Sequence, residues 1–233
     1  MKHKKSLLLA GVFTVLGLGI LMWIGFWQLE RLEWKTALLA KIETNMAMTP
    51  IPLAGLAGLE ENEFRRVCAS GQFLHEQELY LFSTNLTGAG GYHVYTPLII
   101  ADGKALLVNR GWVPNPRKDP ATRLAGQLPG VQMVCGVLRL DGKKRRFAPE
   151  NDPAKGVWFY RDREAMGRAA GLEGPVVAVI DADQTPNPGG YPVGGQTRVN
   201  IPNNHLGYAI TWFGLALALA GVFAVFLISQ QKK

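Results

Sequence analysis

Residues 6–27, SLLLAGVFTVLGLGILMWIGFW, decide the class of the fold. The stretch carries no formal charge. As a helix its 22 residues span about 33 Å, which matches the roughly 30 Å hydrocarbon core of a bilayer. A second uncharged run covers residues 206–231 and is also long enough to cross. We therefore predict two transmembrane helices, at 6–27 and 207–229, and not two buried helices of a soluble protein.

The start of the chain also has features of a cleaved signal peptide, because Lys2, Lys4 and Lys5 precede the apolar run. The run is long for such a signal, and no small-x-small cleavage site follows it. The sequence continues instead as WQLERLEWK, residues 27–35, which keeps helical spacing. We predict an uncleaved anchor that leaves the membrane as a helix.

The formal net charge of +7 comes mostly from the two ends of the chain, which hold five lysines. Residues 28–206 contain 20 basic and 18 acidic side chains, so this region is close to neutral. A nucleic-acid-binding domain concentrates positive charge, and this region does not. We therefore expect no nucleic-acid partner.

The charged tails predict the topology. Cytoplasmic segments next to a span carry an excess of Lys and Arg, which places tails 1–5 and 230–233 in the cytoplasm and residues 28–206 outside. Arg31, Lys35 and Lys41 oppose this assignment, because they are basic residues that follow the first span on the side assigned to the outside.

The region between the spans reads as a mainly antiparallel β domain with one short helix. Short runs rich in Val, Leu, Tyr and Phe are separated by turn signals such as ADGK and LDGK. The predicted strands are FRRVCASGQF, ELYLFSTN, HVYTPLII, ALLVNRGWV, VQMVCGVLRL and PVVAVIDAD. The helix is DREAMGRAAGLEG, with Asp162 at its N-cap. The predicted fold class is an α+β membrane protein, with two transmembrane helices flanking an extracytoplasmic domain.

Two cysteines, Cys68 and Cys135, are too few for a disulfide framework. A single bridge would form in an oxidising compartment. The apolar runs VCA and VCG around them favour two buried free thiols, and the sequence leaves the choice open.

His205 lies where the second apolar run begins. Tyr208 and Trp212 follow at i+3 and i+7, so they share its helical face. Imidazole ligates haem iron, and an aromatic face suits a planar macrocycle. The alternative is an interfacial histidine bonded to a loop carbonyl, with aromatic residues that mark the membrane surface.

Trp27, Gln28 and Arg31 mark the exit of the first span and would form the other wall of such a site. Arg31, Lys35 and Arg198 would neutralise the propionates of a haem. The alternative is a belt of interfacial aromatics with a snorkelling arginine.

Small residues on both runs predict that the two helices touch. Gly214, Ala218 and Gly221 recur at helical spacing on the second run, and Gly17 and Gly25 punctuate the first.

Catalytic motifs are missing from the sequence: it contains no Ser-His-Asp spacing, HExxH, P-loop or GxSxG. We predict that the protein is not an enzyme. The segment VNRGWVP, residues 108–114, ends a strand in a sharp turn, and its Arg110 is expected to be structural or to face a partner rather than catalytic.

Seven blocks in order, between two spans, carry a resemblance to the Surfeit locus protein family, assembly factors for cytochrome c oxidase. The blocks are WQLERLEWK (27–35), GYHVYTPL (91–98), LLVNRGWVP (106–114), GVLRL (136–140), PENDPAKGVWFYRDREAM (149–166), GGQTRVN (194–200) and NNHLGYAITWFGLA (203–216). The resemblance covers nearly the whole chain.

The resemblance implies a multi-pass protein of the bacterial inner membrane, with a large periplasmic loop, that promotes maturation of the haem-bearing oxidase subunit. It implies transient binding of haem a, with His205 as the iron ligand and Tyr208, Trp212, Trp27, Gln28 and Arg31 around it. Haem a synthase and membrane lipid are further expected partners. Gly207 departs from the glutamine common at this position in the family.

A scaffold that stabilises an assembly intermediate without touching haem is the competing hypothesis. A sensor is disfavoured because only QQKK follows the second span, and a hydrolase because no nucleophile constellation is present.

Overall fold

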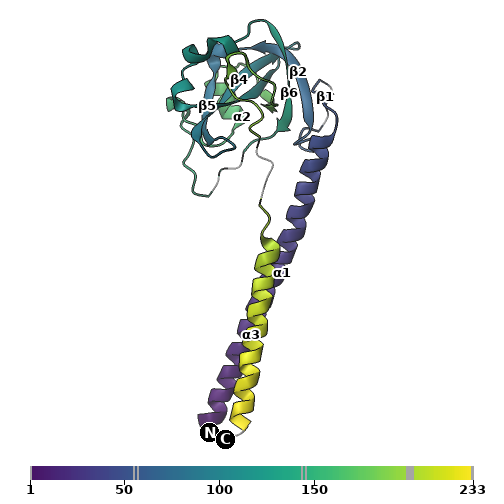
Figure 1. Ribbon diagram of the computed structural model, residues 1–233, viewed down its shortest axis with the longest axis vertical. Coiled ribbons are helices and arrows are strands. Elements are labelled where there is room, and N and C mark those ends of the chain that lie inside the picture. The colour runs from purple at the N-terminus through teal and green to yellow at the C-terminus, as the bar shows by residue number, and fades with distance from the viewer. Residues whose placement is uncertain are drawn as a thin grey trace. The chain divides into compact units, whose positions relative to one another are not determined.

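The computed structural model describes residues 2–54, 56, 58–142, 144, 146–197 and 202–231 (Figure 1). The chain forms two compact units. One is a helix pair made of residues 1–41 and 200–233, and the other is a β domain made of residues 42–199.

The helix pair consists of α1 (Lys2–Ala47) and α3 (His205–Gln231), and each helix contains a segment long and apolar enough to cross a membrane. The 46 residues of α1 extend about 69 Å, so this helix is more than twice as long as a bilayer core is thick. The prediction of a helix that continues beyond the first apolar run is confirmed. The fold class is that of an α+β membrane protein.

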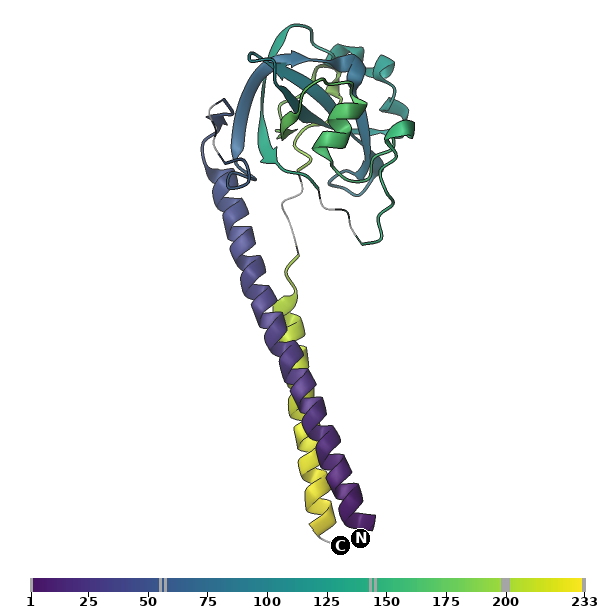
Figure 2. The same ribbon diagram turned by 180° about the vertical axis from the view of Figure 1, so that it is seen from behind.

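The two helices pack against each other in antiparallel orientation (Figures 1 and 2). Gly25 faces Phe213, and Gly17 faces Leu219 closer to the chain ends. A Cβ atom on Gly25 would lie 2.6 Å from the Phe213 ring, so any larger residue there would have to displace this ring. The contact that the sequence predicted between the runs is therefore present.

The small residues predicted on the second run do not make this contact. An added Cβ on Gly214 or Gly221 would meet no atom within 4 Å, and Ala218 is exposed. Ala209 and Ala216 are the buried small residues of α3 instead. Spacing alone identified a stripe of small side chains, but it did not say which stripe faces the partner helix.

The β domain contains a seven-stranded sheet in the order β1-β2-β6-β7-β5-β4-β3, with an additional pairing of β2 and β4. The strands are β1 (Ile51–Pro52), β2 (Arg66–Phe73), β3 (Leu79–Thr84), β4 (Gly90–Ile100), β5 (Ala105–Pro114), β6 (Val131–Arg139) and β7 (Val176–Ala182). Because β2 pairs with both β6 and β4, strands β2, β6, β7, β5 and β4 close into a ring. The pairings β1–β2 and β5–β7 are parallel and the others are antiparallel.

The strands contribute side chains to two hydrophobic cores, because successive side chains of a strand point to opposite faces of the sheet. One core contains Leu53, Val67, Leu98, Leu106, Val108, Leu138, Ala178 and Ile180. The other contains Leu79, Leu81, Tyr95, Leu107, Trp158, Met166, Ala170, Val176 and Val179. Leu106 and Leu107 are adjacent on β5 and enter different cores, so β5 is buried on both faces.

The predicted short helix is α2 (Arg163–Ala169). The Asp162 side chain accepts a hydrogen bond from the Ala165 amide at 2.9 Å, which confirms the predicted N-cap. Met166 is fully buried, and Gly171 ends the segment with φ of 69°. α2 thus covers the second core and forms part of the crossover that makes β5 and β7 parallel.

The expectation of two free thiols is wrong, because Cys68 and Cys135 form a disulfide. They are directly opposed in the antiparallel register of β2 and β6, with Cα atoms 4.1 Å apart. Both side chains are half-buried and not fully buried. Strand pairing across 67 residues brings them together, and local apolar composition carries no information about it.

Candidate functional site

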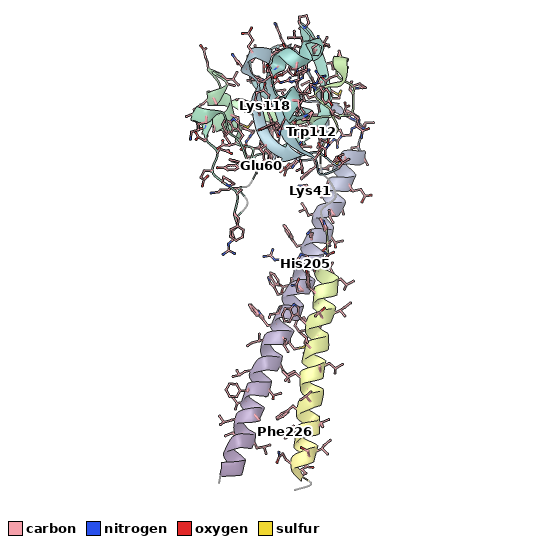
Figure 3. All side chains as sticks on the ribbon, turned by 60° about the vertical axis from the view of Figure 1, so that its left-hand side comes forward. Lys41, Glu60, Trp112, Lys118, His205 and Phe226 are labelled. Carbon is pink, nitrogen blue, oxygen red and sulfur yellow. A yellow bond between two sulfur atoms is a disulfide. The ribbon has the colours of Figure 1, made fainter. Side chains whose placement is uncertain are left out.

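His205 is the first residue of α3 (Figure 3), and its side chain contacts Gln28 of α1. Its Nδ1 lies 2.7 Å from Oε1 of Gln28. The amide oxygen only accepts, so Nδ1 carries the proton and donates it. In the neutral ring Nε2 then keeps its lone pair, which is the form in which imidazole ligates a metal.

Gln28 is 9% exposed, although it follows directly on an apolar run. Its carbonyl fixes both the tautomer and the ring orientation of His205, a role that second-shell partners take at metal sites. Because Gln28 and Gly25 lie three residues apart on α1, the same helix face supplies the close crossing and the partner of the imidazole. Of the residues expected on the wall opposite His205, Gln28 is thus the one that bonds to its ring.

On α3 the buried residues continue in line with His205. Ala209 and Ala216 are buried, and Trp212 between them is half-buried. These positions follow His205 at i+4, i+7 and i+11, which is one face of a helix. Tyr208 is 56% exposed and lies beside this face. Trp212 therefore lies within this buried stripe, and Tyr208 lies at its exposed edge.

Trp27 and Arg31 form a separate cluster on α1. Both are exposed, and the Arg31 guanidinium lies 5.6 Å from the Trp27 ring centroid and 5.8 Å from that of Trp34. This arrangement is a cation–π ladder along one helix edge. Trp27 is one residue from Gln28, about 100° around the helix, so it does not share the buried face.

Lys35 also lies on the Gln28 side of α1, where its Nζ donates to the Pro202 carbonyl. Thr36 accepts from the Asn203 amide at 3.4 Å. These bonds hold the segment before α3 against α1 and so position His205. Arg198, the third cation proposed for haem propionates, lies outside the described residues.

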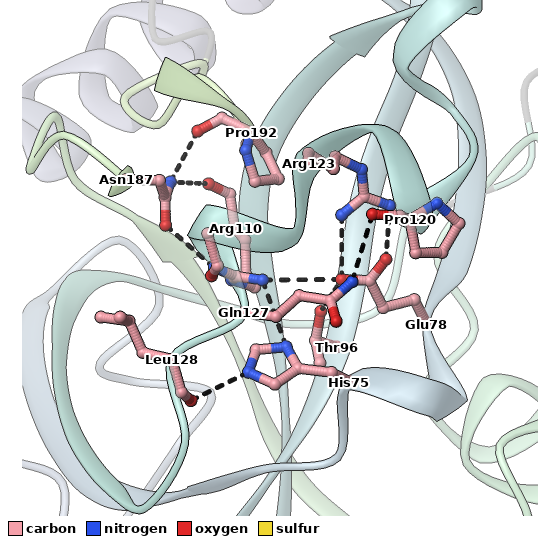
Figure 4. A network of polar contacts seen from close by, with 12 residues as sticks. His75, Glu78, Thr96, Arg110, Pro120, Arg123, Gln127, Leu128, Asn187 and Pro192 are labelled. Atoms are coloured by element: carbon pink, nitrogen blue, oxygen red, sulfur yellow. Dashed lines mark hydrogen bonds and ion pairs between the residues drawn. The ribbon is translucent and has the colours of Figure 1, made fainter. Parts of the chain in front are cut away.

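The β domain contains a buried charged cluster around Glu78 that the sequence did not reveal (Figure 4). Arg123 binds both carboxylate oxygens, with its NH1 3.1 Å from Oε1. Arg110 approaches the same carboxylate at 3.5 Å, and Tyr80 donates to it at 3.1 Å. Burial and the neighbouring carboxylate raise the pKa of Tyr80, so its hydroxyl stays protonated.

His75 belongs to this cluster as a neutral ring. The Arg110 guanidinium can only donate, so the His75 Nδ1, 3.4 Å from NH1, accepts. Nε2 then donates to the Leu128 carbonyl at 3.1 Å. Burial lowers the pKa of His75, which agrees with the neutral form.

Arg110 lies within strand β5, and the segment VNRGWVP forms the end of that strand, as expected. Strand β5 runs on to Pro114, and Trp112 exchanges backbone hydrogen bonds with Val193 at 2.9 Å. Gly111 permits this approach, because a Cβ atom at this position would lie only 2.1 Å from the Val193 carbonyl. The φ angle of Gly111 is 130°, a conformation that favours glycine. The prediction that Arg110 is structural is consistent with its place in the cluster.

The chain matches the model of the SURF1 family over residues 15–217. It is 39% identical over 211 residues to Surfeit locus protein 1 of Mus musculus, covering 84% of this chain and 68% of the relative. It is 40% identical over 214 residues to the Homo sapiens protein of that name, covering 84% and 70%. A SURF1-like protein of Caenorhabditis elegans is 35% identical over 218 residues, covering 83% and 66%.

Proposed function

Because the chain belongs to the SURF1 family, we propose that it is an assembly factor for cytochrome c oxidase that binds haem a transiently through His205. The family is known for oxidase assembly, and the expected role is not enzymatic. The haem-bearing oxidase subunit is the proposed acceptor of the haem, with haem a synthase as the source.

The hydrogen bond between Gln28 and His205 is the observation that carries the haem proposal. It leaves Nε2 as the free ligand atom, and the ring is only half-buried, so a ligand can reach it. When bound, haem a would supply an iron centre, which Nε2 of His205 would ligate. A single protein ligand at an accessible site favours holding the haem briefly and releasing it.

The proposed topology puts both termini in the cytoplasm of a bacterium and residues 28–206 outside its inner membrane. The antiparallel helix pair supports it, since two spans return the chain to its starting side. The Cys68–Cys135 disulfide supports it as well, because bridges persist in oxidising compartments.

The test is a visible spectrum of the full chain, purified from cells that make haem a, beside His205→Ala. We expect a haem band in the wild-type protein and loss of most of it in the variant, since the iron loses its ligand. Equal near-ultraviolet circular dichroism shows that both proteins are folded. If neither protein carries haem while oxidase maturation still needs the gene, the scaffold hypothesis replaces the haem proposal.

Gln28→Leu is expected to weaken haem binding by about 10- to 100-fold, as loss of a second-shell partner does at other metal sites. The reason is that the imidazole loses the bond that fixes its tautomer and orientation. Titration of haem into the purified apoprotein measures the effect. Gln28→Glu, which keeps an acceptor for Nδ1–H, is the matched control and should retain most of the affinity. Equal losses in both variants would assign Gln28 a packing role only.

A further inference from the structure

The loop after β6 carries a large apolar side chain that belongs to neither core of the β domain. Phe147 is 93% exposed, the highest exposed fraction of any large apolar side chain that the structure describes. It follows directly on KKRR, residues 143–146, so an aromatic ring in water lies next to four consecutive basic residues. The proposed haem role uses none of these residues.

Hydrogen bonds hold both ends of this loop against the segment that precedes α2. At one end, the Gly142 amide donates to the Arg161 carbonyl at 2.9 Å, and Nε of Arg161 donates to the Leu140 carbonyl at 2.7 Å. At the other end, Oδ1 of Asn151 accepts from the Phe159 amide at 2.8 Å. The loop is therefore anchored at its base, and the domain presents the aromatic ring to the outside.

The positive charge of the loop is only partly neutralised. Lys144 pairs with Glu150, which offsets one of the four basic side chains. The acidic residues on either side of the loop pair with cations outside it: Asp141 with Arg163 at 3.1 Å and Asp152 with Lys155 at 2.9 Å. The guanidinium of Arg146 lies 5.8 Å from the Phe147 ring centroid and leaves the ring exposed. The loop therefore combines a net positive charge with an accessible apolar group.

A bilayer surface that contains anionic phospholipid matches both parts of this loop. Aromatic side chains settle at the boundary between head groups and acyl chains, and basic side chains beside them are attracted to anionic lipids. A purely polyanionic partner would match the charge but would leave the ring in water.

The chain itself keeps the β domain close to a bilayer. Thr197 is eight positions before His205, where the apolar run of α3 begins, so at most about 28 Å of extended chain separates them. A domain of residues 42–199 has a radius of gyration of about 15 Å. A loop on such a domain can reach the lipid surface, and the tether makes a weak attraction sufficient.

We propose that this loop docks on anionic phospholipid, with the Phe147 ring inserted between the head groups and with Lys144 and Arg146 beside the lipid phosphates. Docking holds the β domain in one orientation on the membrane. The proposal does not depend on haem binding.

The test places a nitroxide on the loop of the full chain in nanodiscs. Cys68 and Cys135 are bonded to each other, so Phe147→Cys supplies the only free thiol for labelling, and the nitroxide keeps an apolar group at this position. Electron paramagnetic resonance then compares collisions of the label with oxygen, which concentrates in lipid, and with a neutral nickel chelate, which stays in water.

We expect the ratio of oxygen to nickel collisions to be severalfold higher in nanodiscs that contain phosphatidylglycerol than in nanodiscs of phosphatidylcholine alone. Salt at about 1 M should remove this rise, because it screens the attraction between the loop and the lipid. Adding Lys144→Gln and Arg146→Gln to the labelled variant should remove most of it as well.

Leu124→Cys is the matched control. Leu124 is 65% exposed, and its neighbour Arg123 is buried and paired with Glu78, so this position is apolar without exposed basic neighbours. A nitroxide there should report water in both kinds of nanodisc.

Three results would overturn the proposal. Frequent collisions of the label at position 147 with nickel in both kinds of nanodisc would show that the loop stays in water. Rare collisions with both reagents would show that the loop packs against protein and not against lipid. A lipid signal of equal size from the Leu124→Cys label would show that the nitroxide itself drives insertion.

Discussion

Glu78→Gln is expected to lower the free energy of unfolding of the β domain by about 3–5 kcal/mol, the cost of breaking a buried ion pair by removing one partner. The Glu78 side chain is 1% exposed, and Arg110 and Arg123 beside it are 5% and 2% exposed. Glutamine keeps the size and one acceptor oxygen but removes the negative charge. Two buried guanidinium groups then remain without a counter-charge.

Urea unfolding of the full chain in detergent, followed by near-ultraviolet circular dichroism, measures this loss. Asp102→Asn is the matched control, since Asp102 pairs with Lys104 at 2.6 Å with its side chain 48% exposed. That variant should leave the urea midpoint nearly unchanged, because exposed pairs contribute little. If the two variants shift the urea midpoint equally, the cluster around Glu78 does not stabilise the fold.

The sequence predicted those parts of the fold that depend on local patterns. Short apolar runs between turn signals located β2 to β7 to within a few residues, and Asp162 marked the start of α2. These signals come from side chains within a few positions of one another, so a single chain is enough to read them.

The closed ring and the charged cluster could not be predicted in this way. Ring closure requires β2 to pair with β4 as well as with β6. The sequence of a strand does not identify which two strands will lie beside it. Glu78 and Arg123 are 45 positions apart, on either side of β4 and β5. From the sequence alone, each residue is expected to be an ordinary surface charge, because their contact depends on how the strands between them fold.

The candidate site was predicted in part. His205 stood out as a polar residue at the start of an apolar run, and Gln28 as one at the end of the other. Trp27 and Arg31 were expected on the same wall; in the structure both are exposed and contact each other, and Trp27 lies about 100° around α1 from Gln28. Helical period alone gives relative directions, and the glycine contact at Gly25 is what identifies the face toward α3.

Loss of the disulfide is the second large effect that we expect. The bridge joins β2 to β6 across 67 residues and so restricts the unfolded chain over nearly half of the β domain. Cys68→Ser combined with Cys135→Ser should lower the free energy of unfolding by about 2–4 kcal/mol, the usual range for such a cross-link. Changing both residues avoids leaving one reactive thiol.

The urea midpoint of the double variant should equal that of the wild-type chain treated with a reductant. Ser70→Ala is the control on the same strand, since Ser70 is exposed and opposes Met133 in the β2–β6 register. Ser70→Ala should leave the urea midpoint nearly unchanged. If the double cysteine variant has the same midpoint as the wild-type protein, the bridge adds no stability.

The same bridge tests the proposed topology. A domain outside the cytoplasm should be oxidised in cells, so a maleimide added after trapping should label wild-type protein only once it has been reduced. Because both cysteines of the chain lie in this bridge, unreduced protein should give no label at all. Full labelling without reduction would place residues 42–199 in a reducing compartment, and the direction assigned to both spans would then have to be reversed.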